Sequence, residues 1–426
     1  MAETKTIIPD SEKSPEQLFA ERQQRMRDAH VLKQPDRIPI QLGLSYMLAE
    51  LGGVTKQELH DNPKKAQEIL EAAALRFQPD TVMGVFSGPE VLRAVGDKTW
   101  KYPGYGLGPN DTFQFVEGEY MKVEEYDDFL EDPSDWATRV YLPRTCTKLE
   151  GLAMLPRLSL NCFGLGLRPV AVLAAPEVVE AAKALYEAAL ASAETMKRAM
   201  ESAQRLAALG FPPIEVFGLF APAPYDAISD TLRGMRGIML DMHRHPEKVL
   251  AAEEKVKSII IKDAVEASKA TGFKYAGSML HRGSDGFMSL KQFERFYWPQ
   301  LRDMWLELID NGITPFVFYE GVWDERLEYL AELPKGKTIG MFQSSDIFRV
   351  KEVLGDTMCI YGGMPNSLLA SGTVQEVRER THQVCEVVGK GGGFVMTTEV
   401  GEMEGSKPEL VQAWVDATKE YGVYES

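Results

Sequence analysis

Short apolar runs that alternate with longer helical patterns are the feature that most limits the possible folds of this chain. Eight runs have the length and residue types of buried strands, and helical patterns separate most of them. Strands that alternate with helices pair in parallel through right-handed crossovers. Eight such units predict an α/β fold, a single (β/α)8 TIM-type barrel, over an open doubly wound sheet. The expected strands are residues 37–43, 80–86, 213–218, 273–277, 314–320, 337–343, 358–363 and 392–398.

The helices expected between these strands carry recognisable end signals. Thr373 is followed three residues later by Glu376, which is the spacing of a capping box. Asn311-Gly312 is a typical C-terminal stop. Helices are therefore expected over residues 16–30, 293–311, 323–333 and 373–390.

The regular alternation is interrupted by an insert at residues 87–212, between the second and third strands. Its last part is a long Ala-, Glu- and Lys-rich helical stretch that starts at Pro176 and stops before Gly210. This helix is expected either to pack against a second subunit in a homodimer or to be an ordinary outer helix. Residues 1–20 lack periodicity and are expected to be a flexible tail, which leaves 21–426 as one barrel domain including the insert.

Charge and composition exclude several classes of partner. Lys and Arg number 47 and Asp and Glu number 63, so the net charge is −16. Such a chain repels nucleic acids and anionic membranes. No apolar run is long enough to cross a bilayer, and residues 1–17 lack the apolar stretch of a signal peptide. With only four, widely separated cysteines, the expected location is cytoplasmic.

The carboxyl ends of the strands are where a (β/α) barrel places its reactive groups. Glu320 ends an apolar run, and a buried carboxylate there needs a metal, a cation or a proton. The alternative is that it only caps the next helix or meets a loop arginine. His281 and Arg282 follow the fourth strand and are expected to bind substrate, unless they are ordinary loop residues. The other candidates are Tyr319, Gln343 and Asp226 as catalytic groups, Phe318 and Phe342 as apolar substrate contacts, and Glu399 as a metal ligand beside Glu320 and His281.

Several known site motifs are missing from the sequence. No GxxxxGK[ST] or GxGxxG motif follows a strand, and there is no HExxH or paired-cysteine spacing. Nucleotide cradles and the common zinc motifs are therefore not expected.

Taken together, several stretches along the chain resemble the uroporphyrinogen decarboxylase superfamily, over roughly residues 25–424. The C-terminal third carries the closest likeness, including Gly-Gly-Met-Pro at 362–365. The resemblance implies a barrel with its site at the strand ends. It rests on residues 25–29, 34–39, 226–234, 245–247, 312–321, 353–356, 362–365 and 372–377.

Two branches of this superfamily are distinguished by their site residues. The decarboxylases proper hold the acidic side chains of uroporphyrinogen with an arginine-rich segment after the first strand, whereas residues 43–50 here contain no arginine. The thiol-methylating, cobalamin-linked methyltransferases bind zinc through a His-x-Cys and a later Cys. Those positions are Phe318, Glu320 and Val400 in this chain. The harder carboxylate donor suits an ether, hydroxyl or amine substrate better than a thiol.

The resemblance therefore implies a corrinoid-linked methyltransferase that demethylates a small methylated compound, such as an aryl methyl ether. Zinc is the expected metal, and the methyl acceptor is expected to be a corrinoid (cobalamin) on a separate protein. To admit that corrinoid, the barrel of this chain would need a broad, solvent-facing mouth. The insert and the loop after His281 are expected to shape this mouth. The alternative is a decarboxylase or lyase for a small organic acid other than uroporphyrinogen, with Arg282 holding the acid and Asp226 moving the proton. A third hypothesis is a non-enzymatic partner of a corrinoid protein.

Overall fold

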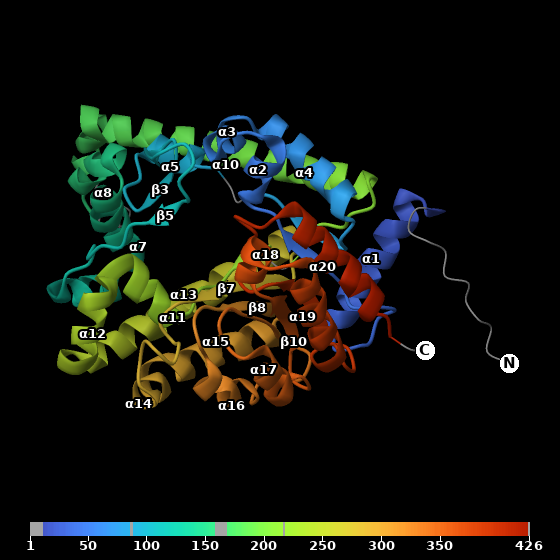
Figure 1. Ribbon diagram of the computed structural model, residues 1–426. Coiled ribbons are helices and arrows are strands. Elements are labelled where there is room, and N and C mark those ends of the chain that lie inside the picture. The colour runs from blue at the N-terminus through green and yellow to red at the C-terminus, as the bar shows by residue number, and fades with distance from the viewer. Residues whose placement is uncertain (1–11, 86–87, 158–167, 216–217, 425–426) are drawn as a thin grey trace.

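The structure is a computed structural model that describes residues 12–85, 88–157, 168–215 and 218–424. It has two layers (Figure 1). The lower layer holds a parallel sheet with its covering helices, and the upper layer holds the N-terminal helices α2–α4 and most of the insert. The strands are β1 (Gln41–Gly43), β2 (Thr81–Met83), β3 (Trp100–Pro103), β4 (Gly106–Leu107), β5 (Gln114–Phe115), β6 (Leu219–Phe220), β7 (Tyr275–Leu280), β8 (Thr314–Tyr319), β9 (Ile339–Phe342), β10 (Cys359–Met364) and β11 (Phe394–Thr398).

The strands of the lower layer pair in parallel, as the sequence predicts. Six of them form one sheet in the order β11-β10-β9-β8-β7-β6, and β1 pairs with β2. A parallel bridge between Ile40 and Met396 places β1 beside β11. The resulting order, β2-β1-β11-β10-β9-β8-β7-β6, matches that of the eight expected strands. Among the described residues, no pairing joins β2 to β6.

The expected strand at 213–218 is the one that differs most from the structure. Its strand, β6, is Leu219–Phe220, whereas residues 213–215 are not in a strand and 216–217 lie outside the described residues. Proline has no N–H to donate to a ladder, so the Pro212-Pro213 pair at the start of the run disfavours strand pairing. The ladder to β7 includes Ala221, whose N–H donates to the Gly277 carbonyl oxygen.

The helices form largely where the sequence predicts them. The Thr373–Glu376 capping box is present and begins α19. The predicted helix at 293–311 consists of a π-helical turn at Phe293–Tyr297 followed by α15, and α14 precedes it. The principal helices are α1 (Pro15–His30), α2 (Met47–Gly52), α3 (Lys56–Asp61), α4 (Pro63–Phe77), α5 (Glu90–Val95), α6 (Tyr126–Glu131), α7 (Pro133–Trp136), α8 (Leu142–Thr145), α10 (Pro176–Ala208), α11 (Pro224–Ile228), α12 (Gly234–Arg244), α13 (Pro246–Thr271), α14 (Leu290–Gln292), α15 (Trp298–Asp310), α16 (Leu327–Leu330), α17 (Ile347–Leu354), α18 (Asn366–Ser371), α19 (Val374–Val387) and α20 (Pro408–Tyr421).

The N-terminal segment is ordered earlier than a tail of residues 1–20 would allow. Helix α1 begins at Pro15, because Ser14 and Gln17 form a capping box and satisfy its first N–H groups. Residues 15–20 are therefore helical, while residues 1–11 lie outside the description.

A buried carboxylate joins α1 to the first two strands. Asp80, fully buried at the start of β2, forms ion pairs with Arg25 of α1 and with Arg37 before β1. It also accepts a hydrogen bond from the Ile40 N–H at 2.7 Å. These cations hold the pKa of Asp80 far below its ordinary value in spite of its burial. Helix α1 is thereby tied to the segments that lead into β1 and β2.

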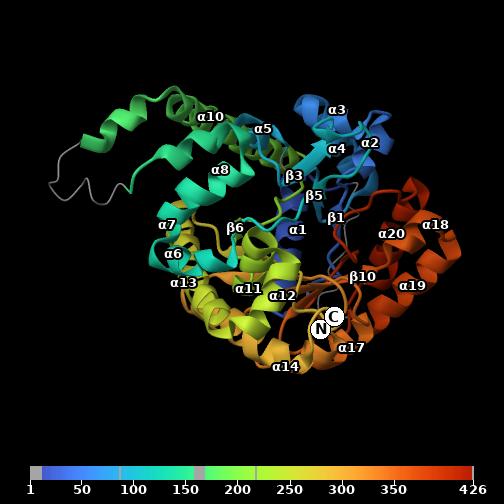
Figure 2. The same cartoon turned by 90° about the vertical axis from the view of Figure 1, so that its left-hand side faces the viewer.

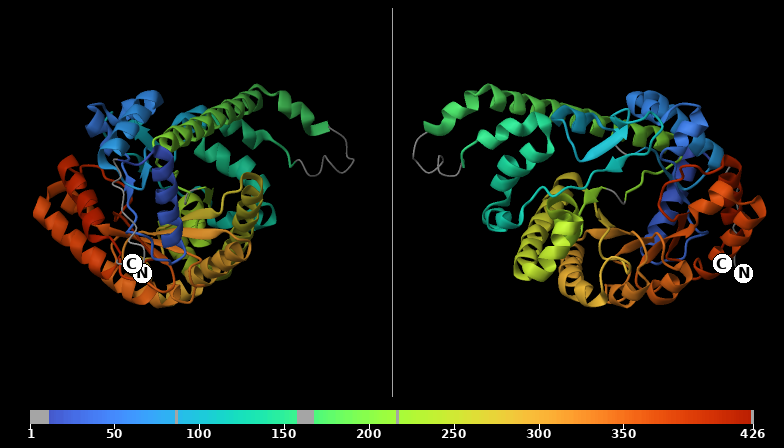
Figure 3. Two further views of the ribbon diagram at one scale, coloured as in Figure 1. Left: turned by 90° about the vertical axis from the view of Figure 1, so that its right-hand side faces the viewer. Right: turned by 60° about the vertical axis from the view of Figure 1, so that its left-hand side comes forward.

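The insert contains structure that the apolar pattern did not predict. Strand β3 pairs with β4 in parallel and with β5 antiparallel, which makes a small separate sheet. Helix α10 extends over 33 residues and packs on α5 and on the 3-10 turns of Thr147–Met154. Figures 2 and 3 show it running along the outer edge of the molecule. No described helix is both long and apolar enough to cross a membrane.

A close backbone approach joins the end of β1 to the loop after β11. A Cβ added at Gly43 would lie 1.5 Å from the Gly401 carbonyl oxygen, a distance that no side chain tolerates. Further along this loop, Glu404 pairs with Lys56 of α3 and accepts a hydrogen bond from the Thr112 hydroxyl of the insert. The loop after β11 thus connects the two layers.

Gly43→Ala is expected to lower the free energy of unfolding by at least about 2 kcal/mol, because the added methyl group forces two backbone segments apart. Chemical denaturation of both proteins measures the change. Gly286→Ala is the matched control, since a Cβ there meets nothing within 4 Å. Equal stability of the two variants would contradict the close approach.

Candidate functional site at the carboxyl ends of the strands

Strand register brings the candidate residues of β7, β8 and β9 to one edge. Leu280 pairs with Tyr319, and Tyr319 pairs with Phe342. The residues that directly follow these three positions are His281, Glu320 and Gln343, so they lie next to one another in three adjacent chain segments. The sequence prediction placed each of the three at the carboxyl end of a strand, and the strand bounds agree with that placement.

Alternation along the strands decides which side chains face the site. In β8, Phe316 and Phe318 pack in a cluster with Met341 of β9, on one face of the sheet. Val317 and Tyr319 belong to the larger core on the opposite face, against the covering helices. Because side chains alternate in a strand, Glu320 and Gln343 share the face of Phe318.

Two predicted site residues therefore lie on the wrong face. Tyr319 and Phe342 are buried and stack on each other with ring centroids 4.4 Å apart, beneath Trp323. They support the strand ends from the helix side and do not reach the mouth. Phe318 is half-buried on the face of the sheet that Glu320 shares, and its role as an apolar substrate contact stays a prediction.

His281 and two carboxylates form the centre of the site. Its Nδ1 lies 2.5 Å from Oδ2 of Asp230, and its Nε2 lies 3.6 Å from Oε2 of Glu320. About half of the Glu320 side chain (49%) and 40% of the His281 side chain are exposed. The ring is thus held on one side by a buried carboxylate and presents its other nitrogen beside an accessible one.

Asp226 positions this histidine from below. It is buried in the first turn of α11, and its carboxylate accepts hydrogen bonds from the N–H groups of His281 (2.8 Å) and Arg282 (3.2 Å) and from the Tyr297 hydroxyl (2.8 Å). Both oxygens are occupied, so the described contacts are those of a positioning residue. The catalytic role expected for Asp226 is not supported by any contact with the mouth.

Arg282 is likewise engaged within the protein. Its Nε donates to Asp230 at 2.9 Å, and its Nη2 donates to Glu117 of the insert at 3.1 Å. The guanidinium also lies over the Phe287 ring. An arginine already paired with two carboxylates is poorly suited to hold the carboxylate of a substrate.

Gln343 and Glu399 have different surroundings. The Gln343 side-chain oxygen accepts a hydrogen bond from the Gly321 N–H at 2.7 Å, which fixes the loop after Glu320. Glu399 begins the loop after β11, and burial raises its pKa although Arg380 lowers it.

Within the described residues, no group of three or more His, Cys, Asp or Glu side chains is arranged to hold a metal. His281 and Glu320 supply two donors, but zinc sites ordinarily have three or four protein ligands, so the described residues do not fit the expected zinc site.

The charges of this network favour a protonated His281. Burial lowers the pKa of His281, but the hydrogen bond with Asp230 and the charges of Asp226, Asp230 and Glu320 together raise it above its ordinary value. Burial and the charge of Asp230 raise the pKa of Asp226. For Asp230, burial is outweighed by His281 and Arg282, and its pKa is lowered. The network therefore stabilises the charged imidazolium form of His281 and the ionised form of Asp230.

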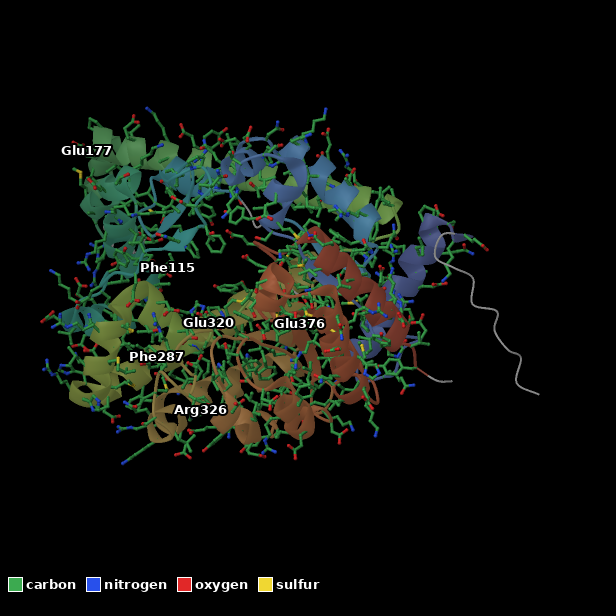
Figure 4. The ribbon with its side chains drawn as sticks, viewed as in Figure 1. Phe115, Glu177, Phe287, Glu320, Arg326 and Glu376 are labelled. Atoms are coloured by element: carbon green, nitrogen blue, oxygen red, sulfur yellow. The ribbon has the colours of Figure 1, made fainter. Side chains whose placement is uncertain are left out.

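The insert covers part of this edge. In Figure 4, Phe115 of β5 and Glu320 lie on facing sides of the space between the two layers, and Phe287 lies lower, within the lower layer. Glu117, two residues beyond Phe115, pairs with Arg282. The site is bordered by the insert, and His281 and Glu320 nevertheless stay accessible.

Asp230 is the site residue that the sequence prediction did not select. It lies four residues after Asp226, a spacing that places two side chains on one face of a helix and was visible in the sequence. Tyr297 and Glu117 had no such signal, because they come from segments distant in the chain.

The comparisons with known proteins can be set beside this geometry. A family model of uroporphyrinogen decarboxylase (URO-D) matches residues 170–421, which is more than half of the chain. The chain therefore belongs to the uroporphyrinogen decarboxylase family, and the resemblance drawn from the sequence is confirmed. The match begins after most of the insert, so it does not include residues 25–169.

A solved structure, a methyltransferase from Methanosarcina mazei, is similar in fold. The likeness has a TM-score of 0.60 at 14% sequence identity and covers 94% of this chain and 98% of that one. No curated protein sequence matches the chain significantly.

Asp230→Asn is expected to lower the pKa of His281 by about one unit or more, because it removes a hydrogen-bonded negative charge. In the parent, the stability supplied by charged His281 is fully present below the ordinary histidine pKa and is lost as the pH rises through the raised value. In the variant this contribution becomes smaller, because only the charges of Asp226 and Glu320 still raise the pKa of His281. NMR titration of the histidine rings, with His281→Gln to assign the signal, measures both curves. Asp303→Asn, an exposed change on α15, is the control, and an unmoved His281 curve in Asp230→Asn would refute the network.

Proposed function

We propose that this protein is a methyltransferase that removes a methyl group from a small methylated compound, such as an aryl methyl ether, and passes it to a corrinoid on a separate protein. The observation that carries the proposal is the position of His281, fixed by Asp230 and facing Glu320 at an accessible strand end. Family membership and the methyltransferase of similar fold support it.

The proposal includes a closed (β/α)8 barrel. The strand order from β2 through β1 and β11 to β6 uses each of the eight expected strands once. A barrel requires β2 and β6 to be neighbours as well, across the segments that contain residues 86–87 and 216–217. Closure would complete the ring of strand ends around His281 and Glu320.

Transfer of a methyl group from an ether requires the leaving oxygen to be protonated, because an unassisted alkoxide or phenoxide leaves poorly. In the proposed step the bond between the methyl carbon and the oxygen breaks, and its electron pair stays on the oxygen. The proton on Nε2 of His281 moves to that oxygen. The corrinoid, when bound, supplies the electron pair that forms the new bond to the methyl carbon.

The surrounding residues fit these roles. Asp230 stabilises the imidazolium before transfer, and Asp226 holds the backbone of His281 so that Nε2 faces the mouth. The carboxylate of Glu320, 3.6 Å away, orients that proton, and the partly exposed His281 takes up a new proton from solvent after the transfer. Phe318 and Phe115 offer apolar surfaces suited to an aromatic or alkyl group.

The expected decarboxylase or lyase would rely on Arg282 to hold an acid. Its pairing with Asp230 and Glu117 disfavours that role, and residues 43–50 contain no arginine to replace it. Release of carbon dioxide from a small organic acid, without demethylation, would favour this alternative.

Zinc remains a prediction of the sequence, and no step of this proposal passes through it. Metal analysis of the purified protein checks the prediction. One equivalent of zinc in the parent, lost in both Glu320→Gln and His281→Gln, would establish a zinc site and change the role of both residues from proton transfer to metal binding.

Glu320→Gln and His281→Gln are each expected to lower the rate of methyl transfer by about 100-fold or more, because each removes a group that handles the proton. The assay incubates the protein with methoxylated aromatic compounds and cob(I)alamin and follows methylcobalamin by absorbance. Glu352→Gln, an exposed change on α17, is the matched control and should keep full activity.

Two results would contradict the proposal. Activity of both site variants equal to that of the control would contradict the assignment of His281 and Glu320 to the active site. Turnover that does not depend on added corrinoid would show that a corrinoid is not the methyl acceptor and would favour another acceptor.

A further inference from the structure

Helix α10 has two apolar faces, and only one of them is covered. Val178, Ala181, Ala184 and Ala188 are buried, and Ala181 and Ala184 pack in a cluster with Leu149 of the insert. The second face is exposed over 22 residues. We call it the outer stripe, and it consists of Val179, Ala182, Tyr186, Ala189, Ala193, Met196 and Met200.

The outer stripe has the spacing of a coiled-coil seam. Its members follow one another at alternating intervals of three and four residues, without interruption, over three heptads. Two leucines, Leu185 and Leu190, widen the stripe on either side and are also exposed. Large side chains such as Tyr186 (66% exposed) rarely form a continuous solvent-facing row on a monomer.

We propose that the outer stripe pairs with the same stripe of a second copy of this chain, with the two helices antiparallel. An antiparallel pair has twofold symmetry, which is the common symmetry of homodimers. When the axis passes between Glu187 and Ala188, Tyr186 of one copy faces Ala189 of the other, and Val179 faces Met196. Each large side chain thereby meets a smaller or flexible one, as packing in a seam requires.

The charges beside the stripe match this arrangement. Glu180 and Lys183 flank its first half, and Glu194 and Lys197 flank its second half. Glu180, Lys183 and Lys197 form ion pairs within the helix and are exposed. In the antiparallel pair, Lys183 of one copy lies alongside Glu194 of the other, and Lys197 lies alongside Glu180. In a parallel pair the twofold axis runs along the seam, so this charged flank would instead face the partner's other flank, where Leu185, Ser192 and Ala199 lie, and its charges would have no partner of opposite sign. The charge pattern therefore favours the antiparallel second copy.

The position of α10 permits this contact. It lies along the outer edge of the molecule in all three ribbon views (Figures 1, 2 and 3), and no described element packs on the outer stripe. Glu177, at the start of α10, lies far from Glu320 in Figure 4, so pairing through this part of the helix leaves the strand ends free.

Sedimentation of the full chain over a wide concentration range tests the proposal. The parent is expected at about twice its monomer mass of 47.6 kDa. Ala189→Glu and, separately, Met196→Glu place a charge in the seam and should weaken the dimer by at least about tenfold in Kd. Ala251→Glu, at an exposed position of α13, is the matched control and should remain dimeric. All the changed positions are exposed in one copy, so thermal unfolding should show that each variant folds.

The orientation is tested by charge reversal. Glu180→Lys should weaken the dimer, and adding Lys197→Glu should restore it, because the pair is then opposite in sign again. A monomeric parent, or a dimer that Ala189→Glu and Met196→Glu leave intact, would overturn the proposal. A dimer weakened by both seam changes but not restored by the double charge reversal would overturn its antiparallel orientation.

Discussion

Parallel pairing in a fixed register is the constraint on which the rest of this structure depends. Each strand of the main sheet runs in the same direction, so the carboxyl ends meet at one edge. The pairing of Leu280 with Tyr319 and of Tyr319 with Phe342 then sets His281, Glu320 and Gln343 side by side. A shift of one residue in the register of a strand would turn its side chains to the opposite face and would separate the residues of the site. The ion pairs of Asp80 act at the other end of the sheet, where they tie α1 to β1 and β2.

The polar network at the strand ends is built from buried carboxylates that have full sets of partners. Asp226 accepts three hydrogen bonds, and Asp230 contacts His281, Arg282 and the Ser229 hydroxyl. Buried charges of this kind are costly unless every lone pair is satisfied, so they fix one arrangement of the loop after β7. The groups of this network that remain accessible for a reaction are the Nε2 atom of His281 and the carboxylate of Glu320. A carboxylate and an imidazolium suit proton transfer to a leaving group better than they suit binding of a soft thiol.

The insert gives the molecule its second layer and borders the site without sealing it. Glu117 reaches Arg282 on one side, and Thr112 reaches Glu404 in the loop after β11 on the other. The insert also contributes the longest helix, whose inner face packs on the rest of the insert and whose outer stripe faces solvent. One segment thus serves both the surroundings of the site and the surface proposed for a second copy.

The sequence by itself determined the parallel α/β class, seven of the eight strand positions, the long helix α10, and the family, because apolar periodicity and helix-end signals are local properties of the chain. It also placed Glu320, His281 and Gln343 correctly, since each directly follows a strand. It misplaced β6, and it missed the small sheet of the insert, whose strands are two to four residues long. Tertiary structure decided which face each side chain takes, and so it moved Tyr319 and Phe342 beneath the site. It also decided that Arg282 is bound by Asp230 and Glu117 and that Glu399 does not complete a metal site with His281 and Glu320 among the described residues. These outcomes depend on contacts between segments as far apart as residues 117 and 282, and no local pattern in the chain encodes such contacts.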